Sequence, residues 1–249
     1  MGSTRIILFS LRFWTQTRLL HYHIKMNVKE IKAVAFDIDG TLYSNARLYA
    51  KIAPFFLKHL FFFMRYNKVR KILHRTGPLP DFFEYQARLL ADGTWLTAAE
   101  ARNKIDEIVY HGLTPYFANL KSHPDVYETF LAFKNAGLKL GILSDFPPRQ
   151  KGDIWGTLPL CDVVMGSEEC GALKPSVYPF GILAEKLGVP ASSILYVGNS
   201  VRSDVLGARN AGMKTAYIMP LWRKIFHFPL KEADICFSNY RQLQKIVLQ

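Results

Sequence analysis

The sequence contains few cysteines and no apolar run long enough to span a membrane. Its three cysteines, Cys161, Cys170 and Cys236, are odd in number and have no metal-site spacing. This pattern excludes a disulfide-stabilised scaffold and favours a reducing compartment, so we expect a cytoplasmic protein. The Phe-rich stretch from 52 to 64 is shorter than the about 20 residues that a spanning helix needs. With 249 residues, 49% of them hydrophobic, the chain can form one large domain or a core with an insertion.

Acidic residues are scarce in two segments, and their absence concentrates the net charge of +12. Residues 45–80 carry eight Lys or Arg and no acid, and residues 1–31 carry five basic residues and one acid. A local basic patch predicts contact with an anionic substrate, an anionic membrane surface or nucleic acid. No aromatic-stacking or groove-reading motif accompanies it, so we expect no nucleic-acid partner.

Residues 1–25 differ from the rest of the chain in being basic and aromatic. The apolar run at 6–9 is too short for a secretory signal and no small-residue cleavage site follows it. Met1-Gly2 begins a possible myristoylation signal, but Ile6 occupies a position that requires Ser or Thr. We interpret this segment as an extension upstream of the folded domain. The alternative is a basic arm for membrane contact or targeting.

An apolar strand that ends in two carboxylates is the central feature of the sequence. Residues 33–36 are followed by Asp37, Asp39, Gly40 and Thr41. Side chains alternate along a strand, so Asp37 and Asp39 leave its end on the same side. Gly40 permits a sharp turn. Since ligands bind at the carboxyl ends of strands in open α/β sheets, two acids here indicate a cation site or covalent chemistry.

The pattern after the first strand divides the chain into two parts. Residues 45–120 are helical, with a break at 77–80 and a capping box, Thr97 to Glu100, that opens the last helix. Beyond 121, strands and helices alternate, which is typical of a parallel sheet. We therefore expect an α/β, doubly wound, Rossmann-like core formed by residues 26–44 and 121–249, with a helical cap subdomain at 45–120.

Polar residues also follow three later strands of the predicted sheet. Ser144 ends one apolar strand, Lys174 lies just past the next, and Asn199 and Asp204 follow a third. Because the carboxyl ends of parallel strands lie along one edge, these side chains can converge with Asp37 and Asp39.

Taken together, these segments resemble the four motifs of the haloacid dehalogenase superfamily. The motifs are Asp37-Ile38-Asp39-Gly40-Thr41, an apolar strand ending at Ser144, Lys174-Pro175, and Gly198-Asn199 with Asp204. The resemblance runs from about residue 31 to the end of the chain. It implies a C1-type helical cap and a magnesium-dependent phosphomonoester hydrolase.

The resemblance also implies a role for each site residue. Asp37 attacks phosphorus to form an aspartyl-phosphate. Asp39 protonates the leaving alcohol and then deprotonates the hydrolytic water. Thr41, Ser144 and Lys174 hold the phosphate, and Lys174 also offsets its charge. The expected Mg²⁺ ligands are Asp37, Asp39 (through its backbone carbonyl), Asn199 and Asp204.

Asn199 departs from the family pattern, which usually has Asp at this place. An amide oxygen still coordinates a hard cation. It supplies one negative charge fewer, so we expect weaker metal binding.

Several alternatives stay open at this point. The substrate can be a sugar phosphate, a phosphoglycolate-like molecule or a nucleotide, and the oligomeric state is undetermined. A phosphomutase or another hydrolase of the superfamily would use the same acids. A dehalogenase is disfavoured, because it has no leaving alkoxide for Asp39 to protonate. A catalytically impaired, basic interaction protein is the hypothesis from another class. The Phe-rich part of the cap either packs its own core or faces a membrane surface.

Overall fold

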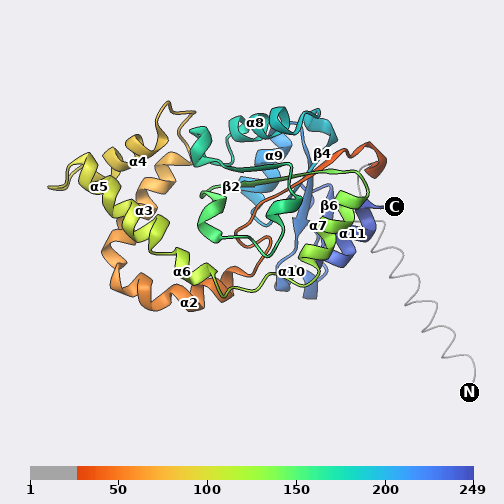
Figure 1. The fold of residues 1–249 in the computed structure, drawn as a ribbon, viewed down its shortest axis with the longest axis horizontal. Coiled ribbons are helices and arrows are strands. Elements are labelled where there is room, and N and C mark those ends of the chain that lie inside the picture. Colours follow the sequence, from red (N-terminus) through yellow and green to blue (C-terminus); the bar gives the residue numbers. More distant parts are fainter. Residues whose placement is uncertain (1–26) are drawn as a thin grey trace, which may run out of the picture.

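A six-stranded parallel sheet with helices on both faces forms the core of the protein, and a helical segment lies to one side of it (Figure 1). The computed structural model describes residues 27–249, so the predicted extension at 1–25 lies outside the described residues. The strands are β1 (Ala33–Phe36), β2 (Lys139–Ser144), β3 (Val163–Gly166), β4 (Ile194–Gly198), β5 (Lys214–Ile218) and β6 (Ile235–Phe237).

Strand β1 lies at the centre of the sheet, whose order is β3-β2-β1-β4-β5-β6. All four of its residues are buried, and Val34 pairs with Leu140 of β2 on one side and Leu195 of β4 on the other. The chain runs outward from β1 through β2 and β3, and then through β4, β5 and β6 in the opposite direction. The strand order therefore reverses between β1 and β4, which is where ligands bind in doubly wound sheets.

Two helical layers cover the sheet, and the side chains of β1 alternate between them. Val34 and Phe36 belong to one hydrophobic cluster, with α7 (Val126–Asn135) and α11 (Tyr240–Val247). Ala33 and Ala35 belong to the other, with α8 (Val177–Leu187) and α9 (Gly207–Asn210). The predicted fold class, a doubly wound parallel sheet with an inserted helical segment, is confirmed.

The inserted segment between β1 and α7 has its own hydrophobic core. It consists of α2 (Asn45–Lys58), α3 (Leu60–Leu73), α4 (Phe82–Ala91), α5 (Ala98–Ile105), the π-helix η2 (Asp106–His111) and α6 (Thr114–Phe117). We call residues 45–117 the cap. The capping box at Thr97 and Glu100 is present and begins α5. The division of the chain at residues 45 and 120 stays a prediction.

The Phe-rich stretch of the cap bends between α2 and α3 at His59. Phe63 is buried in the cap core, and Phe55, Phe56 and Phe62 pack against it. Phe61 alone of the five points outward, with 85% of its surface exposed. Packing inside the cap thus accounts for four of these rings, and membrane contact by the cap stays a prediction. Among residues 27–249, no helix is both long and apolar enough to cross a membrane.

Short helices complete the described chain and connect the main elements. They are η1 (Val28–Glu30), η3 (Pro148–Lys151), η4 (Leu158–Leu160), η5 (Glu168–Cys170), η6 (Ala191–Ser193), the π-helix η7 (Val201–Leu206) and α10 (Leu221–Ile225). Of these, η3 follows β2 and η7 follows β4, so both lie near the carboxyl edge of the sheet.

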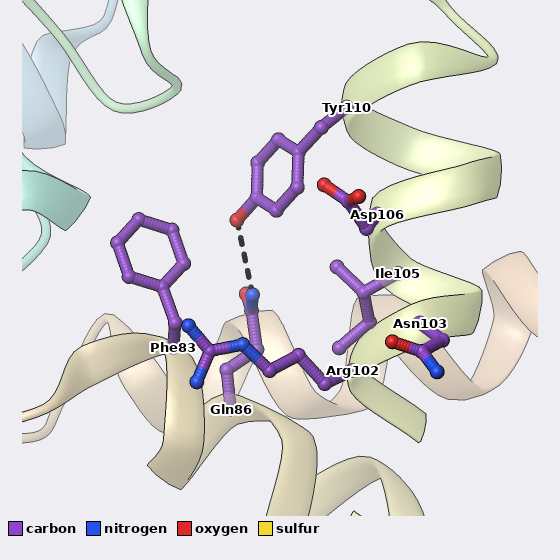
Figure 2. A pocket seen from close by; sticks show the side chains of 7 residues that line it. All are labelled: Phe83, Gln86, Arg102, Asn103, Ile105, Asp106 and Tyr110. Atoms are coloured by element: carbon purple, nitrogen blue, oxygen red, sulfur yellow. Dashed lines mark hydrogen bonds between the residues drawn. The ribbon is translucent and has the colours of Figure 1, made fainter. Parts of the chain in front are cut away.

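A buried polar network joins the cap to the core. Arg70 of α3 forms an ion pair with Glu168 of η5, and both side chains are nearly inaccessible. The Tyr110 hydroxyl donates to Glu168 Oε2 at 2.7 Å, and Gln86 Nε2 donates to the Tyr110 oxygen at 3.1 Å. Figure 2 shows this second bond at the wall of a cavity of about 340 Å³ inside the cap. Three cap helices are therefore attached to one turn of the core.

Replacing Arg70 with Met should lower the free energy of unfolding by about 3–5 kcal/mol, because it leaves the Glu168 carboxylate buried without its cation. Burial raises the pKa of Glu168 above its usual value, although the Arg70 guanidinium lowers it. Removing Arg70 should therefore raise this pKa further. The folded variant then holds a proton that the unfolded chain releases, so its stability should fall as the pH rises above the usual glutamate pKa of about 4.5. Urea unfolding followed by circular dichroism measures both effects.

The matched control for this prediction is Arg88→Met, which breaks the exposed pair with Glu84. Its expected cost is below about 0.5 kcal/mol and independent of pH above the usual glutamate pKa. Equal costs for the two variants would contradict a special role for the cap–core pair.

Candidate active site

The carboxylate of Asp37 lies directly after β1 and is almost completely buried. Its Oδ1 accepts a hydrogen bond from Lys174 Nζ at 2.8 Å, and its Oδ2 accepts one from Thr41 Oγ1 at 2.8 Å. Burial, with the nearby Asp204 and Asp39 carboxylates, raises the pKa of Asp37 to about 7, although the Lys174 ammonium opposes this change. Asp37 is therefore held in one orientation at the switch point of the sheet.

A turn centred on Gly40 places Thr41 behind the Asp37 carboxylate. Gly40 has a φ of +82°, a left-handed conformation that glycine adopts without strain. The Thr41 N–H donates to the Ile38 carbonyl at 3.1 Å, and the Tyr240 hydroxyl of α11 donates to the Thr41 carbonyl at 2.8 Å. A Cβ atom on Gly40 would collide with the side-chain amides of Asn199 and Asn45, so any other residue would push these two side chains aside.

Lys174 is the most heavily bonded side chain of the site. Its ammonium contacts four oxygens: Asp204 Oδ1 at 2.7 Å, Asp37 Oδ1 at 2.8 Å, the Tyr196 hydroxyl at 3.1 Å and the Leu143 carbonyl at 3.4 Å. Burial alone would lower the pKa of Lys174, but the Asp204 and Asp37 carboxylates raise it well above its usual value. The side chain is thus a permanent cation between two carboxylates.

Asp204 connects this cation to the loop after β4. Its Oδ2 accepts the backbone N–H groups of Asn199 at 3.1 Å and Ser200 at 2.8 Å, while Oδ1 faces Lys174. These contacts orient the loop that presents Asn199. Since both oxygens of Asp204 are already occupied, the predicted role of this residue as a metal ligand stays a prediction.

Asp39 is held from three directions. Its Oδ1 accepts a hydrogen bond from the Tyr43 hydroxyl. Its Oδ2 lies 3.3 Å from the donating Ser144 Oγ and 3.1 Å from Lys151 Nζ. The predicted strand-end residues therefore converge on one edge of the sheet. Ser144 contacts Asp39, while Lys174, Asn199 and Asp204 lie around Asp37. Their catalytic roles are proposals, which are argued below.

Sequence reasoning missed three residues of this site: Tyr43, Asp145 and Lys151. Asp145 directly follows Ser144, so it carried the same strand-end signal. Its Oδ1 accepts Ser167 Oγ at 2.7 Å and the Lys174 N–H at 3.1 Å. Burial would raise its pKa, but Lys174 and Arg70 hold it below the usual value. Lys151 belongs to a short irregular stretch without periodicity, and nothing in the sequence connects it with Asp39.

The oxygen atoms around Asp37 fit a magnesium ion by their chemistry. Among residues 27–249, no group of three or more His, Cys, Asp or Glu has the arrangement of a metal site. The Thr41 hydroxyl, however, lies 2.8 Å from Asp37 Oδ2 and 3.3 Å from Asn199 Oδ1, which brings a carboxylate and an amide oxygen together. Asn199 also borders a cavity of about 430 Å³. Mg²⁺ usually keeps several waters and takes few protein ligands, so hard oxygens beside open space suit it.

A doubly wound parallel sheet with acidic and basic side chains gathered at the carboxyl ends of its strands is the architecture of an α/β enzyme. Residues 31–212 match the sequence model described as haloacid dehalogenase-like hydrolase. The chain belongs to this family. The prediction of a phosphatase-type enzyme of the family is also confirmed by its curated relatives.

Two curated relatives and one solved structure show how similar this chain is to known proteins. A glyceraldehyde 3-phosphate phosphatase of Methanopyrus kandleri is 31% identical over 206 residues, which cover 76% of this chain and 84% of the relative. A phosphoglycolate phosphatase of Xylella fastidiosa is 28% identical over 203 residues, covering 77% and 80%. The crystal structure of a HAD phosphatase from Thermococcus onnurineus has a TM-score of 0.55 and 24% identity, covers 87% of this chain and 98% of that chain, and supports the fold.

Substituting Gly40 with Ala should reduce phosphatase activity at least tenfold. The new methyl group meets the side-chain amides of Asn199 and Asn45 and would displace the Asn199 amide from its place beside Thr41. A matched control is Gly137→Ala, whose φ of +79° imposes similar backbone strain where no atom lies within 4 Å. Both variants should lose stability in thermal unfolding, but only Gly40→Ala should lose activity. Comparable activity in the two variants would show that crowding at Asn199 is unimportant.

Proposed function

We propose that the protein is a magnesium-dependent phosphatase that acts on a small phosphomonoester through an aspartyl-phosphate intermediate. The observation that carries this proposal is the buried set Asp37, Lys174 and Asp204, with Asp39 two residues beyond Asp37 at the same sheet edge. The names of the relatives, which act on glyceraldehyde 3-phosphate and phosphoglycolate, support a substrate of two or three carbons.

In the first step, a carboxylate oxygen of Asp37 attacks phosphorus while the bond from phosphorus to the ester oxygen breaks. Asp39, in its protonated form, gives its proton to the leaving alkoxide, so that a neutral alcohol departs. The Tyr43 hydroxyl and the Ser144 hydroxyl each donate a hydrogen bond to the Asp39 carboxylate and thereby fix its orientation. Two carboxylates with different surroundings thereby divide the roles of nucleophile and acid.

In the second step, Asp39 acts as a carboxylate and accepts a proton from water. The water oxygen bonds to phosphorus, the Asp37–phosphorus bond breaks, and phosphate and the free Asp37 carboxylate are regenerated. Lys174, Thr41 and Ser144 stabilise the phosphoryl oxygens in both steps. Mg²⁺, held by Asp37, the Asp39 carbonyl and Asn199, would offset the negative charge of the phosphoryl group.

A catalytically impaired scaffold receives less support from these contacts, and a phosphomutase receives less support from the names of the relatives. The nucleophile, the acid and the lysine positions are all filled and hydrogen-bonded, which a relic without activity does not need. The two curated relatives described above are phosphatases by name.

Replacing Asp37 with Asn should abolish phosphate release, with a loss of at least about 10⁴-fold, because the amide is a poor nucleophile. The assay is phosphate release from a panel of phosphomonoesters with millimolar Mg²⁺ or with a chelator, using the chain from Met26 onward and the full chain. Asp92→Asn, on the exposed end of α4, is the control and should retain full activity. Absence of turnover by the folded unmodified protein on every ester would favour the impaired scaffold.

Replacing Asn199 with Asp should tighten Mg²⁺ binding about tenfold, since a carboxylate supplies a full negative charge beside Asp37. Titration calorimetry of the folded protein measures this directly, and the magnesium concentration at half-maximal activity should fall in parallel. Asn103→Asp, on the exposed face of α5 in the cap, is the matched control. Equal magnesium affinity of all three proteins would contradict the placement of the ion at Asn199.

A further inference from the structure

Lys151 is a buried cation that the mechanism above does not use. It belongs to η3, and its side chain is only 2% exposed. Its Nζ lies 3.1 Å from Asp39 Oδ2, but none of the residues 27–249 accepts a well-directed hydrogen bond from it. The ammonium is bordered by two aromatic rings, those of Phe117 at 5.6 Å and Phe146 at 5.8 Å from their centroids.

The contrast with Lys174 shows how incomplete this environment is. Lys174 has four oxygen neighbours for the three N–H bonds of its ammonium, whereas Lys151 has one. Buried polar atoms are nearly always hydrogen-bonded, and a buried charge with free donors is costly. Asp39 does not need Lys151 to fix its orientation, since Tyr43 and Ser144 already bond to its two oxygens. The free donors therefore point to a ligand.

The position of Lys151 identifies which part of a substrate it would meet. Its partner, Asp39, is the group that protonates the leaving oxygen in the proposed reaction. An ammonium 3.1 Å from that carboxylate lies within reach of the first carbons of the leaving group, whereas Lys174 bonds to the other carboxylate, that of Asp37. Phe117 belongs to the cap helix α6, and its ring lies 5.6 Å from the ammonium, so the cap forms part of the surroundings of Lys151.

The chemistry of the pocket selects the ligand. A desolvated ammonium between aromatic walls forms its strongest hydrogen bonds with an anion. Phe146 is also stacked against the Arg70 guanidinium at 4.5 Å, so two cations flank the same ring. A neutral hydroxyl would not offset the cost of burying this charge.

We propose that Lys151 is a specificity residue that binds a carboxylate on the leaving group, one or two carbons from the ester oxygen. The substrate class is then a phosphorylated hydroxycarboxylic acid. This inference rests on the proposed phosphatase function and narrows its substrate.

The test compares 2-phosphoglycolate with 2-hydroxyethyl phosphate, in which a hydroxymethyl group replaces the carboxylate. The unmodified protein should prefer the acid by about 100-fold in kcat/KM, the scale of a buried charge-assisted hydrogen bond. Lys151→Met should lower kcat/KM for 2-phosphoglycolate about 100-fold and for 2-hydroxyethyl phosphate less than about fivefold, which removes the preference. Lys151→Arg should restore part of it. Lys134→Met, at the surface pair with Asp162, should leave the preference unchanged.

The outcomes separate this inference from the proposed function. Equal losses on both substrates would overturn it, because Lys151 would then act through Asp39 or on the phosphate itself. If the unmodified protein showed no preference for 2-phosphoglycolate, the role of Lys151 would be overturned. Turnover of either ester would still support the proposed phosphatase function. Calorimetry with the Asp37→Asn protein gives a reading without turnover: 2-phosphoglycolate should bind at least tenfold more tightly than 2-hydroxyethyl phosphate, and a second change, Lys151→Met, should remove the difference. Equal binding of the two esters would count against the proposal.

Discussion

The buried ammonium of Lys174 holds the site together, because two carboxylates that would otherwise repel each other both bond to it. Asp37 comes from the end of β1 and Asp204 from η7, and each places one oxygen within 2.8 Å of this nitrogen. Burying three charges is costly unless the remaining hydrogen bonds are satisfied. Here Thr41, Tyr196 and the N–H groups after β4 provide them. Loss of any one partner would leave a charge without compensation at the centre of the sheet.

This network also explains why the fold and the site are closely connected. Lys174 reaches Asp37 because β1 lies next to β4 and β2, whose carboxyl ends supply the surrounding groups. The apolar residues of β1 position its end by packing on both faces of the sheet, and the turn at Gly40 then directs Thr41 back to Asp37. Among residues 27–249, the carboxylates of Asp37, Asp39 and Asp204 share only two ammonium partners, Lys174 and Lys151. The surplus of negative charge agrees with the proposed need for a divalent cation.

The strand-end residues were predictable from sequence because each follows an apolar strand, and strand order alone brings such ends together. Local sequence also predicted the capping box of Thr97 and Glu100, which begins α5. It missed the π-helices η2 and η7, which depend on packing more than on local signals. Sequence reasoning also missed two ion pairs between distant segments. Lys151 lies 112 residues from its partner Asp39, and Arg70 lies 98 residues from Glu168. No periodicity encodes such distant pairings.

The residues that sequence missed lie mostly where the cap meets the core, and this has a physical basis. The reaction common to the family needs fixed side chains at the sheet edge. These side chains directly follow apolar strands, so they can be recognised from the sequence. Selection of a leaving group needs groups that close around it from separate segments. Phe146 illustrates this, since it follows β2 and has the cap residue Arg70 on its ring at 4.5 Å and Lys151 at 5.8 Å. The Glu168 pair fixes Arg70, Arg70 packs on Phe146, and Phe146 borders the ammonium of Lys151. The same contacts therefore attach the cap to the core and form one wall of the proposed leaving-group pocket.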